Sequence, residues 1–406
     1  MRMYTEVLIA LLVMIAIPDI YFYLKLKDRN AKPIYIVLHL IPPLFFTVLF
    51  LYMKFGLETL QNFRIVADIM WLYFFFMLIY IPKVIHIIFY FLDYVYIKIF
   101  KHDNVYFDIT RIIVSIISVI ILLVGAYITP RNFEVVTVQV PINNLPPDFN
   151  GYKIVLISDI HLGSWNKKFE KLKPVIKLVN EQNPDIIIFA GDMVNNFASE
   201  TQGWKPYFLE MKAKSGEYAV LGNHDYGDYT EWNTYNDRLE NRRQIKQFIR
   251  DCGFRLLLNE NVYLKKGRDS LLLVGVENWG KSTRFRYSDL NKALTGSTPN
   301  TPKILISHDP TQFDAEIAGK KDIGLTLSGH THAAQLGIKI GKHLFSPASL
   351  VFKYWAGLYN VNEQYIYVNR GIGYIGLPMH IGVRPEITVI TLKRKQLNIN
   401  AKAQRN

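Results

Sequence analysis

Four long apolar runs in the first third of this sequence restrict its architecture more than any other feature. They span residues 4–24, 33–53, 65–92 and 109–129, and each is near or above the ~20 residues that an α-helix needs to cross a bilayer. The first run has a polar far end and no small-residue cleavage site, which argues against a signal peptide. We therefore predict a transmembrane domain of about four helices over residues 1–130.

The third run contains four residues that are costly in hydrocarbon: Asp68, Pro82, Lys83 and His86. Either these residues line a functional cavity, or the helix ends near Pro82 and Lys83 reaches the lipid surface from an interfacial segment. The sequence leaves both interpretations open.

Loop charges predict the orientation of the helices. One side of the predicted bundle holds Lys25, Lys27, Arg29, Lys32, Lys98, Lys101 and Arg111. The opposite side holds Arg2, Lys54, Arg64 and Arg131. Because the more basic side tends to stay in the cytoplasm, we expect an integral protein of the plasma or inner membrane whose C-terminal domain is extracytoplasmic.

The net charge of +13 fits a protein that works beside anionic lipid or on anionic substrates. Four membrane helices make nucleic acid an unexpected partner, so we predict none. Cys252 is the only cysteine, which excludes an internal disulfide. No feature of the sequence indicates an oligomeric state.

After the membrane part, short apolar runs alternate with polar segments, as in an α/β domain. We place a linker and an entry strand at 131–152, where alternating valines precede a proline-marked turn, and a folded domain at 153–400. Residues 167–182 have helical apolar spacing, with Pro174 as the weak point.

Five predicted strands of this domain each end in Asp, Asn or His. They are KIVLIS before Asp159-Ile-His161, DIIIFA before Gly191-Asp192, EYAVL before Gly222-Asn223-His224-Asp225, KILIS before His308-Asp309, and IGLTLS before Gly329-His330-Thr331-His332. Open α/β sheets build their sites beyond the carboxyl ends of the strands, so these side chains are expected to converge. Glycines before three of them allow tight turns and close approach to a ligand.

This set of side chains predicts a metal site. A His-x-His pair alone is more often two polar residues in a turn, but here carboxylates, imidazoles and an amide gather without a thiolate. Such a set suits two divalent ions such as Mn, Zn or Fe. Two ions about 3.5–4 Å apart, bridged by an Asp, can hold a phosphate and activate a water for in-line attack, so phosphoester hydrolysis is the expected reaction.

In this order the five blocks resemble the calcineurin-like metallophosphoesterases over roughly residues 150–395. The resemblance implies a four-layer α/β/β/α sandwich, here preceded by the four membrane helices. It also implies that one metal is bound by Asp159, His161 and His332, and the other by Asn223, His308 and His330.

The same resemblance makes Asp192 the bridging ligand. His224 would contact the phosphate and assist the leaving group, as a general acid or by charge stabilisation. Asp225 would either orient the His224 imidazole or cap the turn.

The resemblance is stronger to one branch of the superfamily than to others. The stretches GDMVNNF and GNHD lack the pattern of protein Ser/Thr phosphatases, which argues against a phosphoprotein substrate. Residues 369–392 resemble the C-terminal signature of a membrane-anchored branch that includes transmembrane metallophosphoesterases and enzymes similar to UDP-2,3-diacylglucosamine hydrolases. A nucleotide-activated lipid of a lipid A type pathway, cleaved at its pyrophosphate, is the substrate that this branch implies.

Two groups of arginines are candidates for substrate contact. Arg370 and Arg384 either clamp an anionic group or pair with nearby acids. Residues 226–250, with Arg238, Arg242 and Arg243, form either a lipid-facing rim or an ordinary solvated helix.

We therefore predict a metal-dependent hydrolase that acts on a phosphodiester or pyrophosphate bond, with the bilayer and a phosphorylated, lipid-linked substrate as its partners. Two alternatives remain. One is a broad phosphodiesterase that acts on soluble nucleotides, and the other is a metal-binding interaction module without catalysis.

Overall fold

The computed structural model of the 406-residue chain describes residues 5–55, 63–102, 105–165, 168–280, 282–299, 301–341 and 343–395. Arg2, residue 4 of the first predicted span, residue 167 and the end of the predicted domain at 396–400 lie outside these residues, as does the side chain of Arg64. The chain forms two compact units, the second of which begins at Ile128.

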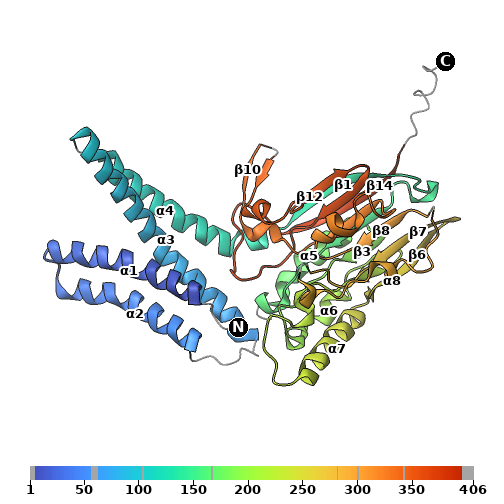
Figure 1. Cartoon of the computed structure of the whole chain (residues 1–406), viewed down its shortest axis with the longest axis horizontal. Helices are drawn as coiled ribbons and strands as arrows, with labels where there is room; N and C mark the ends of the chain where they lie inside the picture. Colours follow the sequence, from blue (N-terminus) through green and yellow to red (C-terminus); the bar gives the residue numbers. More distant parts are fainter. Residues whose placement is uncertain are drawn as a thin grey trace, which may run out of the picture. The chain divides into compact units, whose positions relative to one another are not determined.

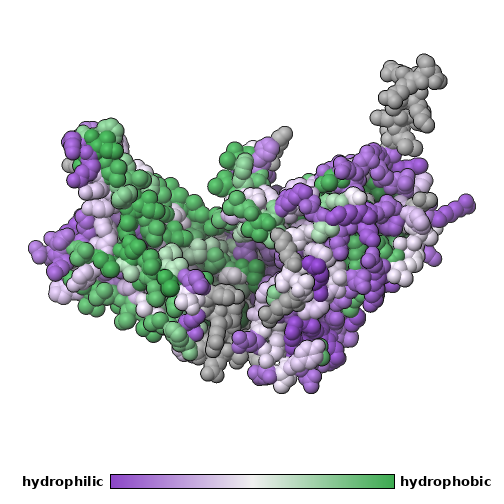
Figure 2. All heavy atoms as spheres, in the orientation of Figure 1, coloured by the Kyte–Doolittle hydropathy of each residue, from purple (hydrophilic) through white to green (hydrophobic). Residues whose placement is uncertain are grey.

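Within its described residues, the first unit contains four long helices (Figure 1). They are α1 (Thr5–Asp28), α2 (Pro33–Phe55), α3 (Phe63–Phe100) and α4 (Val105–Tyr127). All four are long and apolar enough to cross a membrane, which confirms the predicted spans. Figure 2 shows hydrophobic side chains over most of the visible face of this unit, whereas hydrophilic side chains prevail on the visible face of the second unit.

The suggestion that the third helix ends near Pro82 is wrong, because α3 continues through this residue to Phe100. Neighbouring helices allow a proline inside a membrane helix, and Ser115 of α4 donates a hydrogen bond to the Pro82 carbonyl. Lys83 does not reach outward either. Its Nζ lies 2.5 Å from Oδ1 of the buried Asp19 in α1, whose Oδ2 accepts a hydrogen bond of 2.8 Å from Tyr80.

In the second unit, the described residues form two six-stranded sheets (Figure 1). The first sheet has the order β1 (Glu134–Ile142), β14 (Glu386–Arg394), β2 (Lys153–Ile157), β3 (Ile186–Phe189), β4 (Glu217–Ala219) and β5 (Arg255–Leu256). The second has the order β12 (Gly357–Val361), β13 (Gln364–Val368), β9 (Leu325–Ser328), β8 (Lys303–Ile306), β7 (Asp269–Gly275) and β6 (Glu260–Lys266). A separate hairpin consists of β10 (Ile338–Ile340) and β11 (His343–Phe345).

Most neighbouring strands run parallel, including β2, β3, β4 and β5 in the first sheet and β7, β8, β9 and β13 in the second. The predicted entry strand is β1, which pairs in parallel with β14 from Glu134 opposite Glu386 to Ile142 opposite Arg394. The segment that follows the membrane helices therefore completes one edge of the sheet.

Alternation along the strands produces the layers. In β2, Ile154 and Leu156 face the core between the two sheets, while Val155 and Ile157 face a core that also contains the helices. On the outer side of the first sheet lie α5 (Leu172–Glu181), α6 (Lys205–Phe208) and α7 (Tyr235–Asp251). On the outer side of the second lie α8 (Leu290–Ala293) and a helical turn at Phe313–Ile317. The predicted α/β/β/α architecture is confirmed.

The helix expected at 167–182 is shorter in the structure. A 3₁₀ turn at Phe169–Lys171 precedes α5, so Pro174 lies in the first turn of the α-helix. A proline costs little there because the first N–H groups of a helix have no partner within it.

Candidate metal centre

The loops after β2, β3, β4, β8 and β9 meet beyond the carboxyl ends of these strands. They bring together the seven side chains predicted to bind metal, in two groups. The first group contains Asp159, His161 and His332. The second contains Asp192, His308 and His330, and Asn223 lies against it.

Ring nitrogens and oxygens face each other within both groups. In the first, His332 Nε2 lies 3.1 Å from His161 Nε2 and 3.4 Å from Asp159 Oδ1. In the second, Asn223 Oδ1 lies 3.0 Å from His308 Nε2 and 2.7 Å from His330 Nδ1.

Asp192 is placed between the groups. Its Oδ2 lies 3.2 Å from His308 Nε2 and 3.6 Å from His161 Nε2, which belong to different groups. A cation about 2.1 Å from each donor would hold adjacent donors roughly 3.0 to 3.4 Å apart. The donor atoms here are close to that spacing, so the side chains fit a pair of divalent ions that share the Asp192 carboxylate.

The backbone of this site is unusual. Asp159, His161, Asp192, His330 and His332 all have positive φ, between 50° and 75°. This left-handed conformation is uncommon for residues with a side chain and costs free energy, which the surrounding contacts must offset.

Two glycines allow the loops to approach closely. A Cβ on Gly222 would lie 2.2 Å from Asp192 Oδ1, and a Cβ on Gly329 would lie 2.3 Å from Asp159 Oδ2. Neither position has room for a larger residue.

Burial and neighbouring charges act in opposite directions on the ionisable groups of this centre. Burial opposes ionisation of Asp159, but His332 and His308 outweigh it and lower the pKa of this carboxyl to about 2. Burial lowers the pKa of His161 to about 3, which keeps the ring neutral and able to bind metal. For His308 burial acts in the same direction, but the Asp192 carboxylate outweighs it and raises the pKa to about 10.

His308 is oriented by a neighbour. Its Nδ1 donates a hydrogen bond of 2.7 Å to the Ala190 carbonyl, which directs Nε2 into the centre. Among the described residues, no hydrogen-bond partner is found for the buried Nδ1 atoms of His161 and His332.

His224 lies at the edge of the centre and is half-buried. Its Nδ1 donates to the Asn195 carbonyl over 2.7 Å, its backbone N–H donates to Asp192 Oδ1 over 2.9 Å, and its ring lies 5.0 Å from that of His161. The Nε2 atom forms no hydrogen bond with a described residue. The ring is therefore fixed through one nitrogen while the other stays available to a ligand.

Two buried carboxylates hold the loops in place. Asp225 accepts hydrogen bonds from the backbone N–H groups of Asp192, Met193, Val194 and Gly222, so it caps the loops and does not contact the His224 ring. Glu200 accepts from Gly163, Asn195, Asn196 and Phe197. Glu200 was not predicted from the sequence, although a Glu three residues after the start of a helix is a known capping signal.

Tyr229 is a second residue that the sequence analysis did not identify. Its ring stacks on His224 with the centroids 4.6 Å apart, and its hydroxyl accepts a hydrogen bond from Asn223. Burial raises the pKa of this hydroxyl to about 12, so it stays protonated. No sequence pattern singles it out, because aromatic residues are frequent throughout this chain.

The candidate substrate arginines all have partners within the domain. Arg370 pairs with Glu386 and Glu134, and Arg384 pairs with Glu134. These contacts favour the structural alternative over a phosphate clamp. Arg238 and Arg242 of α7 pair with Asp228, and Arg243 pairs with Glu240. Because α7 also buries Ile245 and Ile249, the packed helix is the better description of this segment.

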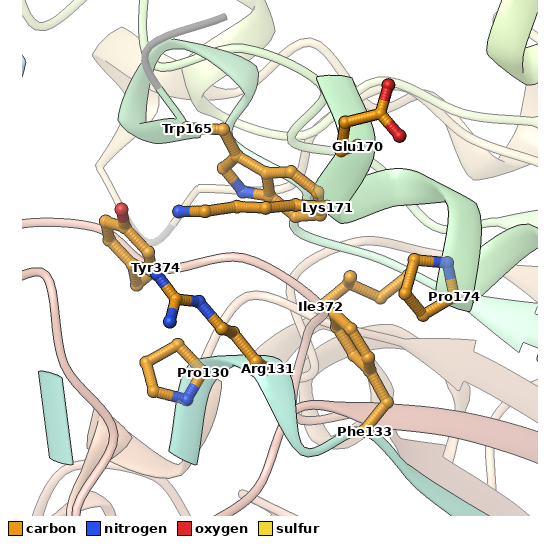
Figure 3. A pocket seen from close by; sticks show the side chains of 9 residues that line it. All are labelled: Pro130, Arg131, Phe133, Trp165, Glu170, Lys171, Pro174, Ile372 and Tyr374. Carbon is orange, nitrogen blue, oxygen red and sulfur yellow. The ribbon is translucent and has the colours of Figure 1, made fainter. Parts of the chain in front are cut away.

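A separate cavity of about 210 Å³ lies beside the start of α5 (Figure 3). Arg131 and Lys171 line it together with apolar side chains, and Figure 3 shows the Glu170 carboxylate turned away from the Lys171 ammonium group. Glu170 pairs instead with Lys173. None of the seven ligand candidates lines this cavity, so it is not the reaction site.

The comparisons with known proteins identify the family of this chain. The family model described as calcineurin-like phosphoesterase matches residues 152–334. The uncharacterized metallophosphoesterase YkuE of Bacillus subtilis is 30% identical over 271 residues, which are 66% of this chain and 88% of that protein. The chain belongs to the calcineurin-like phosphoesterase family.

Two further relatives are named as transmembrane proteins. The transmembrane protein with metallophosphoesterase domain from Danio rerio is 33% identical over 294 residues, 70% of this chain and 62% of the relative. Its counterpart from Bos taurus is 32% identical over 291 residues, 68% of this chain and 61% of the relative. The chain thus spans about three fifths of the length of these two relatives. Together with the four apolar helices, these relatives support the assignment of this chain as a membrane protein.

Proposed function

We propose that this protein is a membrane-anchored phosphoesterase that uses two divalent metal ions to hydrolyse a phosphodiester or pyrophosphate bond. The observation that supports this most directly is the position of Asp192 Oδ2, within 3.6 Å of imidazole nitrogens from both groups of ligand candidates. A site that binds a single ion for structure alone does not need a carboxylate shared between two groups.

When bound, two such ions supply the charge that neutralises a phosphate and lowers the pKa of a water between them. The chain provides the remaining elements. Asn223, His308 and His330 hold one side of the centre, while Asp159, His161 and His332 hold the other. His224 presents Nε2 at the edge, where an imidazolium donates a proton to the departing oxygen.

The first test is hydrolysis of a chromogenic phosphodiester by the full chain with added Mn²⁺. Asp192→Asn should lose most of the activity and one bound metal, because a neutral amide is a weaker bridge between two cations. The exposed, matched variant Asp322→Asn should keep both. Full activity of Asp192→Asn with undiminished metal content would refute the two-ion assignment.

His224→Asn separates proton transfer from positioning. An asparagine amide retains a donor for the Asn195 carbonyl but has no titratable nitrogen. We expect a loss of about 100-fold or more with an alkyl leaving group and a smaller loss with nitrophenolate, which departs without a proton. Equal losses with both esters would exclude the general-acid role.

We further propose that the substrate is a lipid-linked phosphate, and that a UDP-diacylglucosamine is a suitable test compound. The four apolar helices support this proposal because they confine the site to a membrane surface. Purified protein should turn over the lipid in mixed micelles faster than a soluble nucleotide ester at equal concentration. Equal or faster turnover of the soluble ester would favour the broad phosphodiesterase, and metal binding without any turnover would favour the interaction module.

The loop charges support an extracytoplasmic position for the catalytic domain in a plasma or inner membrane. A nucleotide lipid made in the cytoplasm would then lie on the other side, so orientation bears directly on the substrate. A Cys252→Ser, Lys212→Cys variant in whole cells tests it, since Lys212 is exposed. Labelling by a membrane-impermeant maleimide without lysis supports the extracytoplasmic orientation. Labelling only after lysis would place the catalytic domain in the cytoplasm, on the same side as a nucleotide lipid that is made there.

A further inference from the structure

One face of the hairpin β10–β11 is left uncovered by the part of the chain that the structure describes. Its antiparallel register sets Ile338 opposite Phe345 and Ile340 opposite His343. Residues two apart on a strand share a face, as do directly opposed residues, so these four side chains lie on the same face. We call this face, together with Leu350 and Val351 of the turn that follows, the apolar hairpin.

The large apolar side chains of this hairpin are strongly exposed. The exposed fraction is 66% for Ile338, 64% for Ile340, 58% for Phe345, 88% for Leu350 and 65% for Val351. Figure 2 shows hydrophobic side chains on the projecting hairpin that is labelled β10 in Figure 1. Single exposed apolar residues are common on protein surfaces, but a contiguous group of this kind marks a surface that binds a partner.

The charge of the hairpin indicates the kind of partner. Residues 336–352 contain two lysines and one histidine and no acidic residue. Apolar side chains among basic residues are typical of segments that lie in the headgroup region of an anionic membrane. A second copy of this chain is a poorer partner, because it would bring the same basic segment against its own like charge.

The apolar hairpin is connected to the metal centre. The ligand candidate His332 begins the 3₁₀ turn that leads to β10, and Ser346 after β11 donates a hydrogen bond of 2.6 Å to the Ala333 carbonyl. The ring of Phe352 lies 5.6 Å from that of His330. Val351 also lines a cavity of about 430 Å³ together with Pro310 and Thr311, which follow His308.

We propose that the apolar hairpin inserts into the anionic surface of the membrane that the four helices cross, and thereby presents the metal centre to phosphate groups at the lipid headgroups. The insertion depends only on the exposed side chains and their charge. The presentation of substrate rests on the proposed phosphoesterase function.

Fluorescence quenching tests the insertion without any activity measurement. Cys252 is replaced by Ser to leave no native thiol, Ile340→Cys carries the fluorophore, and the matched control carries it at the exposed Lys212→Cys. The full chain is reconstituted in phosphatidylcholine vesicles with or without about 30 mol % phosphatidylglycerol. We expect nitroxide on the lipid chains to quench position 340 roughly threefold more than position 212, and more strongly with the anionic lipid.

The quenching outcomes are distinct. Accessibility of position 340 to aqueous iodide, without lipid quenching, would overturn the proposal. Protection from both quenchers would show that protein covers the hairpin, and a disulfide between two Ile340→Cys chains would identify that protein as a second copy. Either result would also overturn it.

Activity then tests the consequence for the substrate. Ile340→Ser with Phe345→Ser should raise KM for a lipid-presented phosphate about tenfold and leave kcat and the turnover of a soluble ester unchanged. Lys212→Ser serves as the matched surface control. An unchanged KM would show that the hairpin does not contribute to the binding of a lipid-presented substrate. A protein that hydrolyses neither compound would count against the proposed function, but the quenching result would still test membrane insertion.

Discussion

Glu200 offers a quantitative test of how the ligand loops are held. The side chain is 1% exposed and accepts four backbone N–H groups, two on each oxygen. Burial raises the pKa of its carboxyl from the usual 4.5 to about 7, although the four hydrogen bonds act in the opposite direction. The folded protein therefore binds the Glu200 proton more tightly than the unfolded chain does.

The sign of the pH effect follows from this difference. Below pH 4.5 both states are protonated, whereas between 4.5 and 7 only the unfolded state has lost the proton, so stability falls as pH rises. The difference between 4.5 and about 7 corresponds to roughly 3 kcal/mol. Glu200→Gln removes this dependence of stability on pH, because an amide does not titrate. It also sets an amide nitrogen against two N–H donors, which costs roughly 2 to 6 kcal/mol at any pH.

We therefore expect Glu200→Gln to be less stable than the wild type at pH 5, and this difference in the free energy of unfolding to narrow by roughly 2.5 kcal/mol by pH 8. The assay is urea unfolding of the full chain in detergent at constant metal concentration. Tryptophan fluorescence follows the domain, since five of the six tryptophans lie beyond residue 150. Glu210→Gln, at an exposed site, controls for loss of charge. If the free energy of unfolding has the same pH dependence in Glu200→Gln and the wild type from pH 5 to 8, the raised pKa is refuted.

Three further predictions concern the metal centre, the buried cysteine and the membrane helices. Gly222→Ala should weaken metal binding in calorimetry by at least about tenfold, because its Cβ would lie 2.2 Å from Asp192 Oδ1; unchanged binding would mean that the loops move apart freely. Cys252 is buried, and burial raises the pKa of its thiol to about 12. In the native protein at pH 8 it should therefore react with a thiol reagent about a thousandfold more slowly than a free cysteine. In denaturant it should react at the rate of a free cysteine. Lys83→Met should destabilise the helices more than the double variant Asp19→Asn, Lys83→Met in thermal unfolding, since the single change leaves a buried carboxylate without its cation.

The convergence of the seven candidate side chains could be predicted because its signal is local. Each follows a short apolar strand, and parallel strands deliver their carboxyl ends to one edge, so Asp159 and His308 could be expected to meet without knowledge of the loops between them. The helices of the first unit were predictable for a similar reason, since length and apolarity alone define them.

Other features depend on contacts between distant residues. The left-handed backbone at Asp159 and Asp192 follows from the packing of the loops, and nothing in their sequence requires it. Arg370 pairs with Glu134, which is 236 residues away in the sequence. The sequence could not show this ion pair, because it forms only when β1 pairs with β14. The continuation of α3 past Pro82 likewise depends on neighbouring helices.

The Asp19–Lys83 pair has a consequence for how the protein is made. The two residues are 64 positions apart, so at about 5–20 residues per second Asp19 is synthesised several seconds before its cation. During that interval α1 presents a carboxylate that costs about 3 kcal/mol at the centre of a bilayer. Integration of the first helix should then become more favourable once the third helix supplies Lys83, so chains truncated before Lys83 are expected to insert α1 less completely and to be degraded faster by the proteases that remove unassembled membrane proteins.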